Sequence, residues 1–219
     1  MMKILLISAS PRKAKSQTLA LARRVVEGLG PSTRVETVHL RDLKIDFCIH
    51  CQGCHATPMR CPLKDDVHAL LEKMLAADGI IIATPNYINQ VTGAMKAVMD
   101  RSSHFIHCKR LLNKYICAVV TSGSGTDDDL IKDYIRYYAQ MSGAQYSGGV
   151  SAAGNEIRKR AAEAARLGRN LAADIMKRKV YPAQKKRIDA AIAHFGTIIA
   201  ANKARWRGEF AYWKEKGWL

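Results

Sequence analysis

The chain has 219 residues, a length typical of one large domain or of one domain with an appendage. Apolar residues make up 48% and charged residues 25% of it, and these ordinary values exclude a disordered or fibrous protein. The 35 Lys and Arg residues outnumber the 19 acidic residues and give a net charge of +16, so nucleic acid, lipid headgroups, phosphorylated cofactors and acidic proteins are all candidate partners.

Strands and helices are predicted to alternate along the first two thirds of the chain. Short apolar runs rich in β-branched residues predict strands over residues 3–8, 34–40, 79–84, 115–121 and 145–150. Helical periodicity fills the segments between them, over residues 17–30, 65–77, 92–103 and 127–142. This alternation predicts an α/β fold of three layers, in which helices cover both faces of a five-stranded parallel sheet and ligands bind beyond the carboxyl ends of its strands.

The last third of the chain differs in composition. An Ala-, Arg- and Lys-rich helix is predicted over residues 155–179, Tyr181-Pro182 breaks it, and a second helix over about 184–206 leads into an aromatic tail. An amphipathic aromatic tail buries its apolar surface best against a partner subunit. We therefore expect a homodimer or homotetramer whose subunit contacts include this arm.

The chain is therefore expected to have two parts. These are an α/β domain over residues 1–154, with a cysteine-rich insert at 47–62, and an extension of helices and an aromatic arm over 155–219. No apolar run is long enough for a secretion signal or a membrane span. Because four of the six cysteines crowd into 14 positions instead of spreading out as a disulfide framework, we expect a cytoplasmic protein with no membrane partner.

The loop after the first predicted strand carries candidate phosphate ligands. Ser10, Arg12, Ser16 and Thr18 lie between this strand and the next helix, where neither G-x-G-x-x-G nor a P-loop occurs. Hydroxyls, a guanidinium and free amides at a helix N-terminus can bind a phosphate dianion, because all of them donate hydrogen bonds and the helix dipole favours the charge. An ordinary capped turn is the other interpretation, but the position after the first strand favours phosphate.

Two further loops follow the third and fourth predicted strands. The first, over residues 84–92, contains Thr84-Pro85-Asn86-Tyr87-Ile88 and offers a flat aromatic ligand both hydrogen bonds and an apolar wall. The second, over residues 121–125, contains two glycines that allow close approach to the backbone. Since all three loops leave one edge of one sheet, together they predict a ligand site.

The three loops occur in an order that resembles the flavodoxin-like NAD(P)H-dependent FMN reductase superfamily over about residues 1–150. Lys96, Asp100 and Arg101, in the helix after the second of these loops, form a K-x-x-x-D-R motif that is also similar to this superfamily. The resemblance implies a flavodoxin-like fold that binds FMN. It implies phosphate ligation by Ser10, Arg12, Ser16, Gln17 and Thr18. It implies contacts to the flavin ring from Pro85, Asn86, Tyr87, Ile88, Ser122 and Gly123.

The insert contains four closely spaced cysteines, Cys48, Cys51, Cys54 and Cys61. Three thiolates at successive C-x-x-C spacing, with a fourth from a short loop, fit an iron–sulfur cluster, whereas a zinc site or unligated, redox-reactive thiols are the alternatives. Within the superfamily this segment resembles that of the iron–sulfur flavoproteins. The resemblance implies a four-iron four-sulfur (4Fe-4S) cluster.

Other candidate residues receive simpler interpretations. Cys108 and Cys117 are expected to be core or near-surface thiols rather than ligands. His50 and His55 are expected to be exposed loop residues, although either could replace a cysteine as a ligand. The acidic run over 127–129 is expected to begin a helix, where its charge suits the dipole.

The resemblance implies an FMN-dependent oxidoreductase of the iron–sulfur flavoprotein type. It would pass electrons between a 4Fe-4S cluster, FMN and an unidentified small-molecule acceptor, with NAD(P)H or a protein such as ferredoxin as donor, and no side chain is expected to act as acid or base. An NAD(P)H-dependent FMN or quinone reductase without a cluster, and a non-enzymatic electron carrier, are the alternatives. The positive charge argues little for nucleic acid, because residues 151–219 hold 16 basic and 6 acidic residues and so carry most of the excess.

Overall fold

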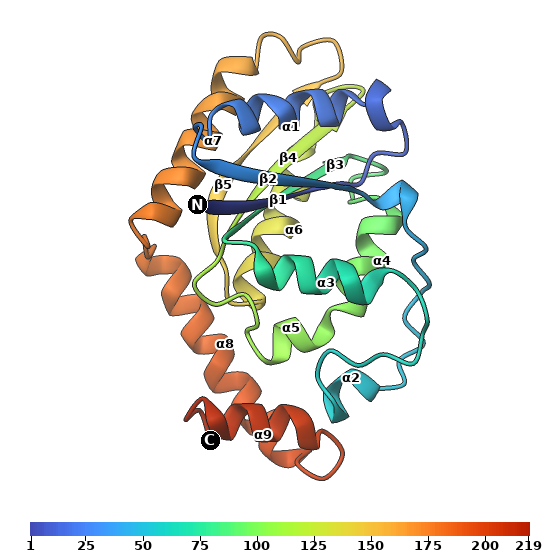
Figure 1. Cartoon of the computed structure of the whole chain (residues 1–219), viewed down its shortest axis with the longest axis vertical. Helices are drawn as coiled ribbons and strands as arrows, with labels where there is room; N and C mark the ends of the chain where they lie inside the picture. Colours follow the sequence, from blue (N-terminus) through green and yellow to red (C-terminus); the bar gives the residue numbers. More distant parts are fainter.

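A five-stranded parallel sheet forms the centre of the computed structural model, which describes residues 1–219 (Figure 1). Its strands are β1 (Met2–Ser8), β2 (Thr33–His39), β3 (Gly79–Pro85), β4 (Tyr115–Ser122) and β5 (Gln145–Ala153). They lie in the order β2-β1-β3-β4-β5, and every neighbouring pair is parallel. The predicted flavodoxin-like α/β fold is thereby confirmed.

The register of the sheet brings three loops to one edge. Ser8 at the end of β1 pairs with Ala83 of β3, and Pro85 at the end of β3 pairs with Thr121 of β4. Because the strands are parallel, the chain leaves β1, β3 and β4 at the same side of the sheet. This edge is where the sequence predicts a ligand.

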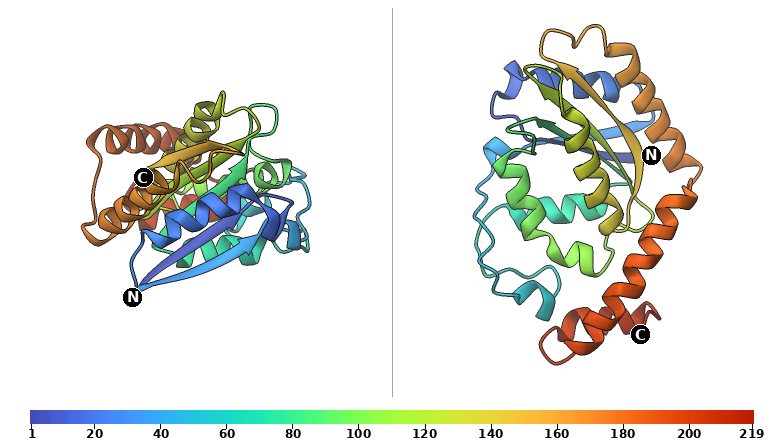
Figure 2. Two further views of the ribbon diagram at one scale, coloured as in Figure 1. Left: turned by 90° about the horizontal axis from the view of Figure 1, so that it is seen from above. Right: turned by 180° about the vertical axis from the view of Figure 1, so that it is seen from behind.

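Helices cover both faces of the sheet (Figures 1 and 2). One face carries α1 (Gln17–Glu27) and α7 (Ala161–Met176), and the other carries α3 (Val67–Ala76), α4 (Gly93–Arg101) and α6 (Asp128–Met141). Along β1, Ile4 and Leu6 are buried under the first layer, and Leu5 and Ile7 under the second. The central strands are therefore apolar on both faces, as expected for a parallel sheet.

Helix α7 differs from its prediction in extent and in place. It begins at Ala161, because residues 154–160 form successive turns that reverse the chain after β5, and not near residue 155. It packs so closely on α1 that a Cβ built at Gly168 would lie 1.9 Å from the carbonyl oxygen of Val25. Helix α7 falls in the segment that we assign to the extension from the sequence, but it is part of the layer that covers the sheet. Of the helices with nine or more residues, only α8 (Pro182–Ala201) and α9 (Arg207–Glu215) lie outside the two helical layers.

Four short helices complete the domain: 3₁₀ turns η1 (Lys13–Lys15) and η2 (Leu40–Asp42), and helices α2 (Gly53–Ala56) and α5 (Ser103–His107). The helix predicted over residues 92–103 is confirmed as α4 with its caps Thr92 and Ser102, whereas α5, which follows it, was not predicted. The two separate at Ser102, whose hydroxyl donates to the carbonyl of Met99 and is 2.7 Å from the hydroxyl of Tyr138. The break lets α5 turn toward the insert.

The C-terminal helices form a second packing centre. Pro182 begins α8, which runs away from the sheet, and α9 then turns back beside α2 and α5 (Figures 1 and 2). Trp213 is fully buried against Cys108 and Ile199 and donates to the carbonyl of His107 across 3.2 Å. Much of the aromatic arm is thus buried against its own chain, while its predicted part in a subunit contact stays a prediction. None of the helices combines the length and hydrophobicity that crossing a membrane requires.

Candidate functional site

The three loops at the sheet edge enclose one cavity of about 200 Å³. Nine of the eleven residues predicted to bind a flavin nucleotide line it, together with Thr121: Ser10, Arg12, Gln17, Thr18, Pro85, Asn86, Tyr87, Ser122 and Gly123. Ser16 and Ile88 do not line it. Residues from three parts of the sequence therefore meet around one space.

The N-terminus of α1 opens into this cavity. The Ser16 hydroxyl accepts a hydrogen bond of 3.0 Å from the amide of Leu19, so it caps the helix instead of lining the cavity. The amides of Gln17 and Thr18, in the same first turn, donate to no group of the chain. The Thr18 hydroxyl lies 2.6 Å from that of Thr121 and joins the first loop to the third. Free amides at the positive end of a helix dipole suit an anion such as a phosphate.

The loop after β3 makes a tight turn. Ile88 and Asn89 have φ values of 51° and 56°, and the backbones of Tyr87 and Gln90 exchange two hydrogen bonds across the turn. This geometry leaves the side chain of Ile88 fully exposed and that of Tyr87 half exposed. Tyr87 lines the cavity, and Ile88 does not.

Asp128 is a site residue that the sequence analysis did not identify. It is buried at the start of α6, where its carboxylate accepts hydrogen bonds from Asn86 Nδ2 (3.1 Å) and Ser122 Oγ (3.2 Å). The acidic run does begin a helix, as expected, but Asp128 also fixes the second and third loops relative to each other. The signal available in the sequence was the position of this run just after the loop at 121–125.

The four insert cysteines line a second cavity with Arg101 and Ser103. All four are free thiols; Cys48, Cys51 and Cys61 are exposed, and Cys54 is half-buried beside the Ser103 hydroxyl. Burial raises the pKa of Cys54 above its usual value, although the hydrogen bond with Ser103 opposes this. The chain thus collects four possible sulfur ligands at one place. Cys108 and Cys117 are buried core thiols, as predicted.

Arg101 anchors the base of the insert. Its guanidinium makes two hydrogen bonds to Asp65 (2.6 and 3.0 Å), one to the carbonyl of Asp46 (2.8 Å) and one to Cys61 Sγ (3.4 Å). Burial opposes ionisation of Asp65, but hydrogen bonds from Arg101 and from the amides of Asp46 and Val67 outweigh it and keep the pKa of Asp65 below its usual value. The arginine of the K-x-x-x-D-R motif therefore holds the two ends of the insert together.

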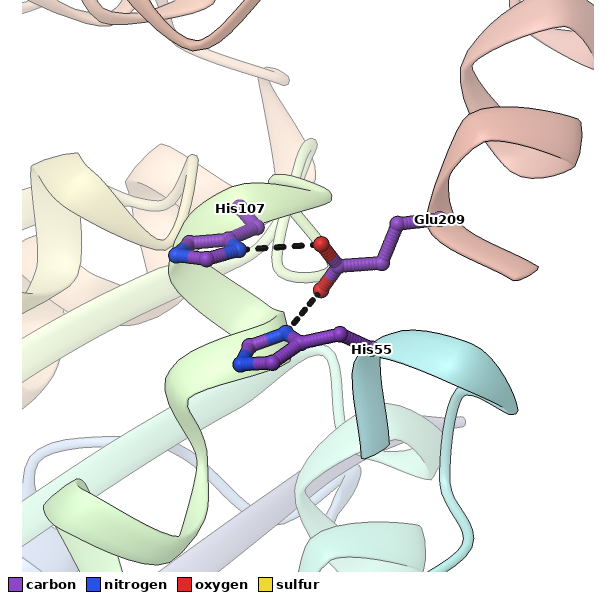
Figure 3. Close-up of side chains that lie close together, drawn as sticks. All are labelled: His55, His107 and Glu209. Carbon is purple, nitrogen blue, oxygen red and sulfur yellow. Dashed lines mark hydrogen bonds and ion pairs between the residues drawn. The ribbon is translucent and has the colours of Figure 1, made fainter. Parts of the chain in front are cut away.

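His55 is buried, contrary to the expectation of an exposed loop histidine, because α9 covers it. Figure 3 shows His55 and His107 on one side of the Glu209 carboxylate, with Nδ1–O distances of 2.7 and 2.9 Å. These three residues offer possible metal-ligand atoms within 4.8 Å of one another. However, the two rings are stacked 16° from parallel, so their Nδ1 atoms point side by side at the two carboxylate oxygens and do not converge on one ion. We therefore interpret the trio as a hydrogen-bonded clamp.

Known proteins resemble this chain in sequence and in fold. The sequence profile of the NADPH-dependent FMN reductase family matches residues 2–156. An "iron-sulfur flavoprotein" of Archaeoglobus fulgidus is 40% identical over 124 residues, which cover 56% of this chain and 60% of the relative. The chain thus matches less than two thirds of that relative. A second iron–sulfur flavoprotein of the same organism is 27% identical over the full length of both proteins.

The fold is also that of a solved structure, the NAD(P)H:quinone oxidoreductase of Methanothermobacter marburgensis, with a TM-score of 0.60 and 18% identity over 78% of this chain and 96% of the other. The family profile spans β1 to β5 and includes every residue that lines the cavity between the three loops. The chain therefore belongs to the NADPH-dependent FMN reductase family.

Proposed function

We propose that the cavity at the sheet edge binds FMN. The free amides of Gln17 and Thr18, together with Ser10 and Arg12, would hold the phosphate, because they place hydrogen-bond donors and a positive charge at a helix N-terminus. Pro85, Asn86, Tyr87, Ser122 and Gly123 would lie along the flavin ring, with Ser16 and Ile88 supporting their loops. The observation that carries this proposal is the meeting of these residues around one cavity.

The cavity would enclose only part of the nucleotide. Its volume of about 200 Å³ is below the roughly 300–1,000 Å³ of enclosed small-molecule sites. Tyr87 and Ile88 are exposed beside it. A second copy of the chain would cover this apolar rim in a homodimer or homotetramer, and the remaining opening would admit the acceptor.

The insert would hold a 4Fe-4S cluster through Cys48, Cys51, Cys54 and Cys61. Four free thiols around one cavity are the ligand set that such a cluster takes, and the Arg101 N–H group already donates to one of the sulfurs. Several relatives are named iron–sulfur flavoproteins, which supports the same assignment. Bound FMN supplies two-electron chemistry and a cluster one-electron chemistry, so together they suit an oxidoreductase that passes electrons to an unidentified acceptor.

The chain itself would position the two groups and limit the access of water. NAD(P)H or a protein such as ferredoxin would be the donor. The side chains of Phe47 and Ile49 are 79% and 61% exposed beside Cys48 and offer such a protein an apolar contact.

The second candidate is an NAD(P)H-dependent FMN or quinone reductase without a cluster. It is favoured by the match to the reductase family and by the exposure of three of the four thiols.

Substitution of one thiol distinguishes the two candidates. Cys51→Ala is expected to lose its iron and to keep FMN, because Cys51 is exposed and lies outside the flavin cavity. Arg60→Gln is the matched control, since Arg60 is exposed in the same insert and does not line the cysteine cavity. Iron, zinc and FMN would be measured in each protein after anaerobic purification. A wild-type protein with FMN and no metal would support the reductase without a cluster, and joint loss of iron and FMN in Cys51→Ala would contradict the division of roles.

A further inference from the structure

We propose that the C-terminal helix α9 is a positioning element of the cysteine site. Through Trp206, Gly208 and Glu209 it holds the half of the insert that carries Cys51 and Cys54. The identity of the bound group rests on the proposed function, but the contacts that hold the insert do not. Along the sequence, this segment lies more than 140 residues after the cysteines.

Glu209 provides the first contact. It is fully buried, and its two carboxylate oxygens accept from His55 on α2 and His107 on α5 (Figure 3). Hydrogen bonds to a buried carboxylate are among the stronger ones in proteins, and a buried carboxylate without partners is costly. Since His55 follows Cys54 directly, the carboxylate fixes the backbone next to a proposed ligand.

Trp206, just before α9, provides the second contact. Its indole N–H donates to Gln52 Oε1 across 2.9 Å, and its ring lies 4.9 Å from that of His55 and 5.0 Å from that of His107. Gln52 adopts a left-handed conformation with φ of 59°, which is unfavourable for a residue with a side chain. The contact from Trp206 holds this residue in place between Cys51 and Cys54.

Gly208 provides the third contact. A Cβ at this position would lie 2.5 Å from the carbonyl oxygen of Ala56 and 2.4 Å from Cδ of Pro58. The first turn of α9 therefore lies directly on the end of α2, with no room for a side chain. Figures 1 and 2 show the two segments side by side at one end of the molecule.

The insert has little other support at this end. Helix α2 has four residues and could not persist alone, because so short a helix does not offset the cost of nucleation. Arg101 holds the other end, near Asp46, Cys61 and Asp65. We therefore expect loss of the α9 contacts to loosen the segment around Cys51 and Cys54 while the base at Arg101 stays closed.

Hydrogen exchange of the metal-free, reduced, full-length chain tests this directly. In Glu209→Ala and in Gly208→Ala, amides of residues 50–57 should exchange at least about tenfold faster than in the wild type, because each change removes or separates the contacts with α2. Amides of β1 and β3 should be unchanged. The matched control is Glu215→Ala, on the same helix but with a side chain 73% exposed. Unchanged exchange over residues 50–57, or equal acceleration throughout the chain, would overturn the proposal.

A second measurement addresses the bound group. In iron-loaded protein, both variants should release iron to a chelator several-fold faster than the wild type and Glu215→Ala. Equal release rates would overturn the role of α9 at the metal site. A wild-type chain that binds no iron would instead contradict the proposed function, and the exchange experiment would still decide whether α9 holds the insert.

Discussion

Asp128 shows how one buried carboxylate can organise a cavity without lining it. It accepts hydrogen bonds from Asn86 and Ser122, two residues that do line the cavity where we propose that FMN binds. In Asp128→Ala both loops lose their common anchor, and because hydrogen bonds to a charged group contribute about 1.5–3 kcal/mol, we expect FMN affinity to fall about tenfold or more. Titration of the metal-free chain with FMN, followed by flavin fluorescence, measures this.

Asp129→Asn is the control for that prediction. The Asp129 side chain is 87% exposed, pairs only with Lys132 and lies one residue further along the same helix. It should therefore bind FMN as the wild type does. Equal FMN affinities for Asp128→Ala and Asp129→Asn, with both proteins folded, would show that the anchor does not matter for binding.

Lys109 predicts a pH dependence of stability. Its side chain is fully buried, donates to the carbonyls of Ile106 and Met141, and lies 4.4 Å from the centre of the Phe195 ring. Burial lowers the pKa of Lys109 to about 8 from 10.5 in the unfolded chain. Between these values the unfolded state binds the proton and the folded state does not, so this group adds stability as the pH rises from about 8 to 10.5.

Comparison with Lys109→Met isolates that effect from other titrating groups. The free energy of unfolding of the wild type, minus that of the variant, should rise by at most about 1.4 kcal/mol per pH unit over this interval. Chemical denaturation at pH 7, 8, 9 and 10 measures the difference. A difference that is constant with pH would mean that the lysine keeps its usual pKa in the folded chain, and one that falls would mean that its pKa is raised; either result would contradict the prediction.

At the scale of elements, the contact between α1 and α7 depends on glycine. A Cβ at Gly168 would lie 1.9 Å from the carbonyl oxygen of Val25, which is backbone and cannot move aside. Gly196 on α8 has room, because a Cβ there would lie 3.4 Å from the Trp213 ring. Alanine gains up to about 1 kcal/mol over glycine within a helix. We therefore expect Gly196→Ala to leave the melting temperature unchanged or raise it, and Gly168→Ala to lower it by several degrees.

Thermal unfolding of both variants checks this opposite response. Similar melting temperatures for the two would mean that α7 does not pack against α1 as described.

The elements themselves could be predicted where their pattern is local. Apolar β-branched runs identified all five strands. Loop chemistry and strand order predicted a ligand site at one sheet edge, and the family resemblance named nine residues that line the cavity there. The burial of His55, the anchoring role of Arg101 and the clamp at Glu209 could not be predicted. Each depends on a contact between segments far apart in sequence, and no periodicity records which of these segments meet.

At the scale of the whole molecule, the net charge of +16 belongs mainly to residues 151–219. The structure divides this region. Helix α7 covers the sheet, whereas α8 and α9 extend to the insert and bury Trp213 and Glu209 there. The molecule thus has a flavodoxin-like domain with a cavity at one sheet edge, where we propose that FMN binds, and a cysteine cavity between the insert and the segment from Asp100 to Ser103. The C-terminal helices pack against the insert from outside this cysteine cavity.

The central claim is that this fold holds both FMN and an iron–sulfur cluster. The most direct test is to measure FMN and iron in the anaerobically purified wild-type chain. We predict flavin absorption bands above a broad cluster absorbance, with about one FMN and about four irons per chain. Protein that contains no iron, or that contains no flavin and does not bind added FMN, would contradict it.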